Sequence, residues 1–191
     1  MILGLDISTS IVGFTVVDNE GKIIRCDVWD LRNKNKFENC FEKAKFIKDD
    51  LCYLKAQYPI QQIYIEQPFM FFRSGGSSAK TMAKLQKFNG IVSWLCYDVF
   101  NMTPEHLTAM TARKLCGIKI KRGQKAKQIV IQWVLDNEEK FKVAYTSKNN
   151  PKPKYYDMAD SVVIAKAGYY LFQTGKKHTC YNQEVPQSET N

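Results

Sequence analysis

The chain has 191 residues, which is the length of one ordinary domain and short for two. Its 45% hydrophobic and 25% charged residues are globular values, and they argue against a disordered chain, a collagen or a coiled coil. With 28 Lys and Arg against 19 Asp and Glu, the net charge of +9 favours a polyanionic partner, most often nucleic acid.

The sequence carries no sign of a membrane or secretory protein. No apolar run approaches the ~18 residues that a membrane-spanning helix needs, and the N-terminus is too briefly apolar for a signal peptide. The six cysteines form no CxxC pair, so we expect reduced thiols rather than a zinc site or a disulfide framework. We therefore expect a cytoplasmic protein without membrane partners, in the host cytoplasm if the chain is viral.

Short β-branched runs separated by turn signals open the chain. The runs at 2–7, 11–18 and 22–30 are predicted to pair as three antiparallel strands. Apolar residues then recur at steps of three and four across 36–57, which predicts an amphipathic helix, and 60–66 predicts a fourth strand.

The second half of the chain is predicted to be mostly helical. A helix is expected across 78–100, and a fifth short strand within 105–112. Two further helices are predicted across 124–139 and 156–173, joined by a loop rich in Lys, Asn and Pro at 145–154.

This order of elements predicts an α/β fold. We expect a mixed five-stranded sheet, three antiparallel strands followed by parallel strands, flanked by helices. No repeat or linker divides the chain, so a single domain is expected over 1–174, with a poorly ordered C-terminal tail over 175–191.

Four acidic residues sit where buried elements end or begin. Asp6 lies near the end of one predicted strand and Glu66 ends another, and each taken alone is explained as a turn cap or a solvent-facing acid. Asp157 and Asp160 open the last helix three residues apart, where acids also complement the helix dipole. If the two strands are neighbours, the four carboxylates converge and need a cation. Mg²⁺ and Mn²⁺ prefer such oxygen ligands, and two ions about 4 Å apart support phosphoryl displacement.

Aromatic and basic residues lie near these acids in the sequence. Phe69 is the first of three phenylalanines in a Gly-rich loop after Glu66; buried core is one explanation, and stacking on unpaired bases is the other. Seven basic residues and no acid occupy 113–127, which is either a solvated face or a phosphate-binding track. The residues that we expect to contact nucleic acid are Phe69, Lys114, Lys119, Lys121, Arg122, Lys125 and Lys127.

Several short motifs, in order, resemble the RuvC family of Holliday-junction resolvases, which has the RNase H-like fold. The resemblance covers about residues 1–173. It rests on Ile2–Asp6, Ile65–Met70 and Asp157–Ser161, with similar stretches at Leu115–Ile118 and Gln124–Gln128.

The resemblance implies the role of each acid. Asp6, Glu66, Asp157 and Asp160 match the four catalytic metal-binding carboxylates of the family. It implies a Mg²⁺-dependent endodeoxyribonuclease with two Mg²⁺ ions per site, replaceable by Mn²⁺, and two-metal hydrolysis of the phosphodiester.

The resemblance also implies how DNA is bound. Phe69 matches an aromatic residue used against bases at the junction centre. Lys114 and Lys125 match basic residues near the scissile phosphate, Lys125 only with a two-residue insertion. The family acts as a homodimer that nicks a four-way junction at paired symmetric positions, with the helix at 78–100 in the dimer contact.

Some features depart from the family and keep alternatives open. Ile7-Ser8 replaces the usual Pro-Gly, and 145–154 and 175–191 look like additions. A broader branched-DNA nuclease, an RNA–DNA hybrid nuclease and a non-catalytic junction-binding protein remain alternatives, although the four acids argue against the last. An ATP-binding protein of the actin-like group would need two such domains. The Lys- and Asn-rich composition hints at a viral or bacteriophage source, and no motif identifies a branch-migration motor as a partner.

Overall fold

A mixed five-stranded sheet with the order β3-β2-β1-β4-β5 forms the centre of the protein. The computed structural model describes residues 1–68 and 79–175. β1 pairs antiparallel with β2 and parallel with β4, β2 pairs antiparallel with β3, and β4 pairs parallel with β5. This confirms the predicted sheet. The strands are β1 (Ile2–Asp6), β2 (Ile11–Val17), β3 (Ile23–Asp30), β4 (Gln62–Glu66) and β5 (Glu105–Leu107).

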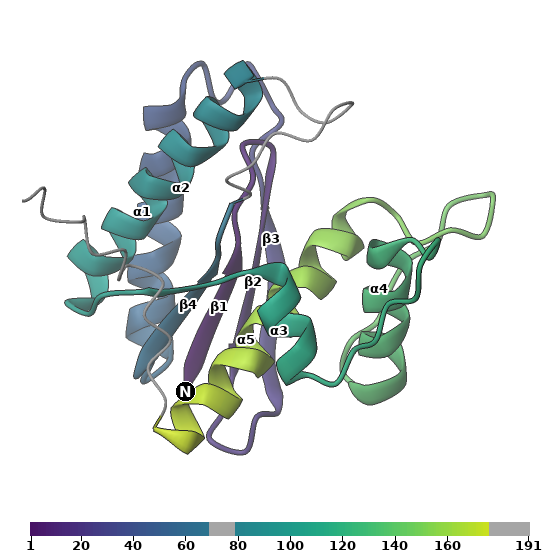
Figure 1. Cartoon of the computed structure of the whole chain (residues 1–191). Coiled ribbons are helices and arrows are strands. Elements are labelled where there is room, and N and C mark those ends of the chain that lie inside the picture. The colour runs from purple at the N-terminus through teal and green to yellow at the C-terminus, as the bar shows by residue number, and fades with distance from the viewer. Residues whose placement is uncertain (69–78, 176–191) are drawn as a thin grey trace, which may run out of the picture.

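Helices cover both faces of the sheet (Figure 1). Two of them, α1 and α2, pack on one face, while α5 crosses the other face and carries α3 and α4 on its outer side. Within the described ranges, no helix is long and apolar enough to cross a membrane. The helices are α1 (Cys40–Gln57), α2 (Ala79–Phe100), α3 (Ala109–Leu115), α4 (Ala126–Asn137) and α5 (Lys154–Thr174).

The fifth short strand predicted within 105–112 is confirmed at Glu105–Leu107. The residues that follow it form α3, a helix that the sequence did not predict. Thr108 caps this helix, since its hydroxyl accepts a hydrogen bond from the backbone N–H of Thr111 at 3.1 Å. The expected tail falls almost entirely at 176–191, outside the described residues.

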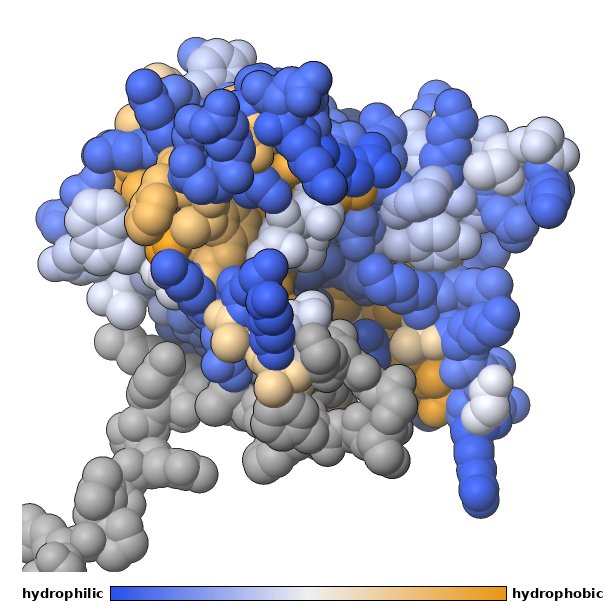
Figure 2. All heavy atoms as spheres, turned by 90° about the horizontal axis from the view of Figure 1, so that it is seen from above, coloured by the Kyte–Doolittle hydropathy of each residue, from blue (hydrophilic) through white to orange (hydrophobic). Residues whose placement is uncertain are grey.

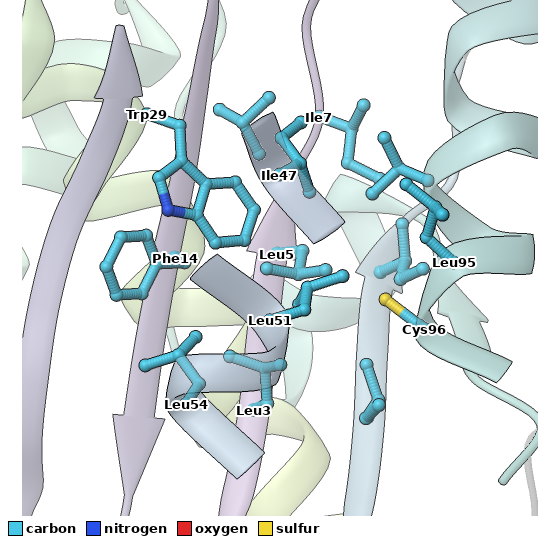
Figure 3. Packing of buried hydrophobic residues seen from close by; sticks show 14 of the residues in the cluster. Leu3, Leu5, Ile7, Phe14, Trp29, Ile47, Leu51, Leu54, Leu95 and Cys96 are labelled. Carbon is cyan, nitrogen blue, oxygen red and sulfur yellow. The ribbon is translucent and has the colours of Figure 1, made fainter. Parts of the chain in front are cut away.

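Long apolar side chains fill the space between the sheet and α1 (Figure 3). Leu3 and Leu5 of β1 point toward Ile47 and Leu51 of α1, and all four are inaccessible to solvent. They form one buried cluster with the residues of β2, β3 and α2. At 25 cal/mol per Å² of buried apolar area, such a cluster is the main source of stability for a domain of this size.

The opposite face of the sheet is built for close approach. A methyl group on Gly4 of β1 would overlap the backbone of Ala165 in α5, and one on Gly168 of α5 would overlap the ring of Tyr64 in β4. Small residues at these contacts let the axis of α5 lie close to the strands. The position of α5 is therefore set by contacts between its backbone and the sheet.

Candidate active site

Asp6 and Glu66 lie at the ends of adjacent parallel strands. Leu5 of β1 is paired in register with Ile65 of β4, so the acid that follows each of them emerges at the same edge of the sheet. The condition set out from the sequence, that the two strands be neighbours, is met.

The first turn of α5 is held against the same edge. Asp6 is paired with Gly13 of β2, and a methyl group on Gly13 would overlap the backbone carbonyl of Asp157. The glycine thus lets Asp157 and, one helical turn later, Asp160 approach the end of β1. Gly13 is a determinant of the site that the sequence interpretation did not single out.

A row of buried polar side chains between β2 and α5 holds this first turn of α5 in place. The hydroxyls of Ser161 in α5 and Thr15 in β2 lie 2.8 Å apart, and the Ser161 hydroxyl donates to the carbonyl of Met158 at 2.7 Å. Oγ1 of Thr15 also lies 3.2 Å from Sγ of Cys26. Because buried hydroxyls need partners, this row specifies one position of the helix on the sheet. The available signal was a threonine in the middle of an otherwise apolar strand.

The four carboxylates share one electrostatic environment. Burial raises the pKa of Asp6 well above its ordinary value, and the charges of Glu66, Asp160 and Asp157 raise it further. Burial also raises the pKa of Glu66 to about 7, again with a contribution from Asp160. The pKa of Asp160 is raised to about 6, first by burial. Buried like charges of this kind favour binding of a cation or a proton.

A lysine from α4 lies between the two acids of α5. Nζ of Lys127 donates to Oδ1 of Asp157 at 3.1 Å and lies 3.7 Å from Oδ2 of Asp160. Burial lowers the pKa of Lys127, but the two carboxylates outweigh it and the net shift is upward. The structure therefore shows that this position accommodates a positive charge.

Two arginines add positive potential around the acids. Arg113 in the last turn of α3 lowers the pKa of Glu66 and of Asp160. Arg32, directly after β3, forms a bidentate ion pair with Asp30 and also interacts with Asp157. Arg32 was not found from the sequence because it lies far from the basic segment at 113–127.

The donor set suits a hard divalent cation. All four acids supply oxygen, which Mg²⁺ and Mn²⁺ prefer over nitrogen and sulfur. As the side chains stand, no group of three or more His, Cys, Asp and Glu residues in the described part of the chain meets the requirements of a metal site. The carboxylates fit the ion by chemistry and burial, with Lys127 paired to two of them.

The other residues expected to contact nucleic acid are distributed around this edge. Lys114 lies in the last turn of α3, Lys125 is the N-cap of α4, and both are exposed. Lys119, Lys121 and Arg122 are also exposed between these two helices. Phe69 lies outside the described residues. Of the predicted basic residues, the structure brings Lys127 into contact with the acids.

The structure was compared with known proteins. The sequence matches no protein-family model, and no curated protein sequence matches it significantly. RuvC from Thermus thermophilus in complex with a Holliday junction substrate superposes with a TM-score of 0.66 at 15% identity, over 92% of this chain and 96% of that one. The chain has the RNase H-like fold of RuvC.

Two further structures agree with this result. A second structure of T. thermophilus RuvC gives a TM-score of 0.60 at 16% identity, over 92% of this chain and 97% of that one. The yeast mitochondrial Holliday junction resolvase Ydc2 gives 0.56 at 17% identity, over 88% of this chain and 77% of that one. The likeness to RuvC thus extends over most of the chain, as the sequence motifs predicted.

Proposed function

We propose that this protein is a Mg²⁺-dependent endonuclease that resolves Holliday junctions by paired symmetric nicks. The observation that carries the proposal is the convergence of Asp6, Glu66, Asp157 and Asp160 at one edge of a RuvC-like fold, through strand register and the seat of α5. The Holliday junction seen with T. thermophilus RuvC supports the same substrate class here.

The four carboxylates would hold two Mg²⁺ ions, which Mn²⁺ could replace. When bound, the ions would activate the attacking water and neutralise charge on the leaving oxygen. Asp6 lies on the central strand of the sheet, and its carboxylate interacts with those of the other three acids, so we assign it the central role in holding the ions. Burial of Asp6 and Glu66 strengthens their attraction for a divalent cation relative to an exposed site.

Lys127 is assigned to the DNA phosphate beside the scissile bond. Its ammonium group is paired with Asp157 and Asp160, so occupation of the acids by divalent ions would free it for an anionic ligand. The neighbouring Lys125, which the resemblance to RuvC matches to a basic residue near the same phosphate, is exposed at the helix N-cap, so its substitution compares the two assignments. Lys127→Ala is expected to slow cleavage at least tenfold more than Lys125→Ala.

Paired nicks require two sites, and we propose that the protein acts as a homodimer through α2. Trp94 and Tyr97 of this helix are 58% and 49% exposed, and Gly90 lies one turn before Trp94 on the same face. Such a strip is self-complementary in a twofold dimer. Trp94→Glu is expected to give a monomer in sedimentation that no longer makes coordinated nicks. A sedimenting dimer of this variant would contradict the α2 interface.

The deciding experiment is cleavage of end-labelled synthetic four-way junctions with Mg²⁺. Linear duplex, flap and RNA–DNA hybrid substrates are run beside them, together with Asp6→Asn as a control that retains shape and loses one carboxylate. Paired symmetric nicks in the junction alone, abolished by Asp6→Asn, are the expected result. Preference for flaps or for the hybrid would favour a broader nuclease, and tight junction binding without cleavage would leave a non-catalytic binding protein.

A further inference from the structure

A projecting hairpin connects α4 to α5, and we call residues 142–154 the finger (Figure 1). Tyr145 and Pro151 form an antiparallel bridge. The backbone N–H of Lys152 donates to the carbonyl of Ala144 at 2.9 Å, and that of Thr146 donates to Asn150 at 2.8 Å. The finger is thus a hydrogen-bonded structure with a defined direction.

A left-handed residue closes the tip of the finger. Asn149 has φ of 56°, and its backbone N–H donates to the carbonyl of Thr146 at 2.9 Å. At the base, Phe141 is buried and Val143 packs against the cluster beneath α5. The finger is anchored at its base and exposed at its tip, an arrangement typical of surface loops that bind a partner.

The charge of the finger has one sign. It contains four lysines and no acid, and three of the four are exposed. Tyr145 beside them is 49% exposed. Viewed from above, hydrophilic side chains cover most of the side of the molecule on which Figure 1 places α4 and the finger (Figure 2). The lysines are Lys142, Lys148, Lys152 and Lys154.

The finger leads directly into the acids of α5. Lys154 begins the helix three residues before Asp157. The pKa of Asp30 at the end of β3 is lowered mainly by Arg32, and Lys154 adds a smaller contribution. The base of the finger therefore lies on the β3 side of the carboxylates, whereas Lys127 approaches them from α4. Lys154 thus adds to the positive charge that Lys127, Arg113 and Arg32 place around the acids.

We propose that the finger is a DNA-binding arm that contacts the phosphates of a duplex arm of the substrate next to the cleaved strand. This inference rests on the proposed function for the identity of the substrate. The finger adjoins the carboxylates in the chain, and this favours a nucleic acid over an acidic protein as its partner. A DNA strand bound at the carboxylates would continue past the neighbouring finger. Evenly basic, hydrogen-bonded hairpins suit phosphate contacts, which position DNA without reading its sequence.

The test compares two double variants that lose the same charge. Lys148→Ala with Lys152→Ala removes two lysines of the finger. Lys22→Ala with Lys140→Ala removes two exposed lysines near Asp18, at the opposite end of the sheet from Asp6. Affinity for a labelled four-way junction is measured in EDTA over a series of NaCl concentrations, with thermal unfolding as a check of folding.

Each phosphate contact contributes about 0.9 to the slope of log K against log salt. The finger variant is expected to lower this slope by about 1.8 relative to the wild type, and the control variant to leave it unchanged. Equal slopes for the two variants would overturn the inference. Loss of binding to a partner protein, with no change in junction binding, would also overturn it. Cleavage by the wild type is read separately. If the wild type does not cleave the junction but the finger variant still lowers the salt slope, the proposed catalysis is wrong and the inference about the finger holds.

Discussion

Ile47 and Leu51 of α1 meet the sheet through long aliphatic side chains, whereas α5 meets it through Ala165, Gly168 and the backbone at Asp157. Leu5 and its neighbours fill the first interface, and Gly4 and Gly13 leave room in the second. β1 and β2 therefore present large residues to α1, and at Gly4 and Gly13 they present no side chain to α5.

The two interfaces, with α1 and with α5, make different contributions to stability and to the proposed catalysis. Large side chains keep a helix at a distance and bury apolar area, which is the main stabilising contribution. Glycine contacts bring a helix backbone close enough to fix the carboxylates of Asp157 and Asp160 beside Asp6. We expect changes on the α1 side to alter stability without altering chemistry, and changes on the α5 side to do both.

The largest expected effect on stability lies on the α1 side. Leu51→Ala leaves a cavity in the fully buried cluster, so the free energy of unfolding should fall by about 2–5 kcal/mol. Denaturant unfolding measures the loss, and single-turnover junction cleavage below the unfolding midpoint should keep the wild-type rate. A hundredfold slower reaction in the folded variant would break the proposed separation.

The acids make stability depend on pH in the metal-free protein. Glu66 has a pKa of about 7 when folded and an ordinary value of 4.5 when unfolded, so the folded state binds more protons between these pH values. The titration of Glu66 should lower stability by up to about 3 kcal/mol as pH rises through this window. Asp160, with a pKa raised to about 6, extends the fall to lower pH.

The change of stability with pH is measured by thermal unfolding in EDTA at pH values from roughly 4 to 8. Glu66→Gln should reduce the fall in stability with pH, and Leu51→Ala should lower stability equally at every pH. Added Mg²⁺ should stabilise the wild type more above pH 7 than below, because the ion competes with the protons. A stability that rises with pH in EDTA would contradict the buried, mutually repelling carboxylates.

A smaller stability effect with a larger catalytic one is expected on the α5 side. Gly13→Ala forces the carbonyl of Asp157 away from β2, which as overpacking costs about 1–3 kcal/mol. Cleavage of the four-way junction should fall by more than this destabilisation explains, since two carboxylates move with the helix. Leu51→Ala is the control, because it is destabilised at least as much and leaves the contacts of α5 with the sheet in place. Normal cleavage by Gly13→Ala would show that the close approach is not needed.

The smallest effect is expected for the buried hydroxyl pair. Ser161→Ala removes the hydroxyl partner of Thr15 and should cost about 1 kcal/mol in the free energy of unfolding. A double-mutant cycle with Thr15→Val measures the coupling between the two side chains. Strict additivity would mean that the pair does not hold the helix on the sheet.

Much of this arrangement was predictable from the sequence. Strand-terminal Asp6 and Glu66 and the helical spacing of Asp157 and Asp160 indicated a shared acidic edge, and the alternation of elements predicted the sheet. The helix α3 was missed because its residues follow a strand without a glycine or proline. Only the Thr108 cap signals the change.

The role of individual lysines was not predictable in the same way. Lys125 and Lys127 are two residues apart, and successive helical residues point about 100° apart, so the rotation of α4 decides which one faces the acids. That rotation depends on how α4 packs on α5, which no local pattern contains. The Ser161–Thr15 pair, 146 residues apart in sequence, is hidden for the same reason.

The packing of α5 against β1 and β2 also has a consequence for the order of folding. Asp6 and Gly13 belong to the first two strands, while Asp157 and Asp160 belong to the helix farthest along the described chain. Contacts of such high sequence separation form late, because closing long loops costs entropy that local pairing does not. The hairpin of β1 and β2 can form while the acidic edge is still incomplete, so a growing or partly folded chain would lack the full set of carboxylates until its last described helix has docked.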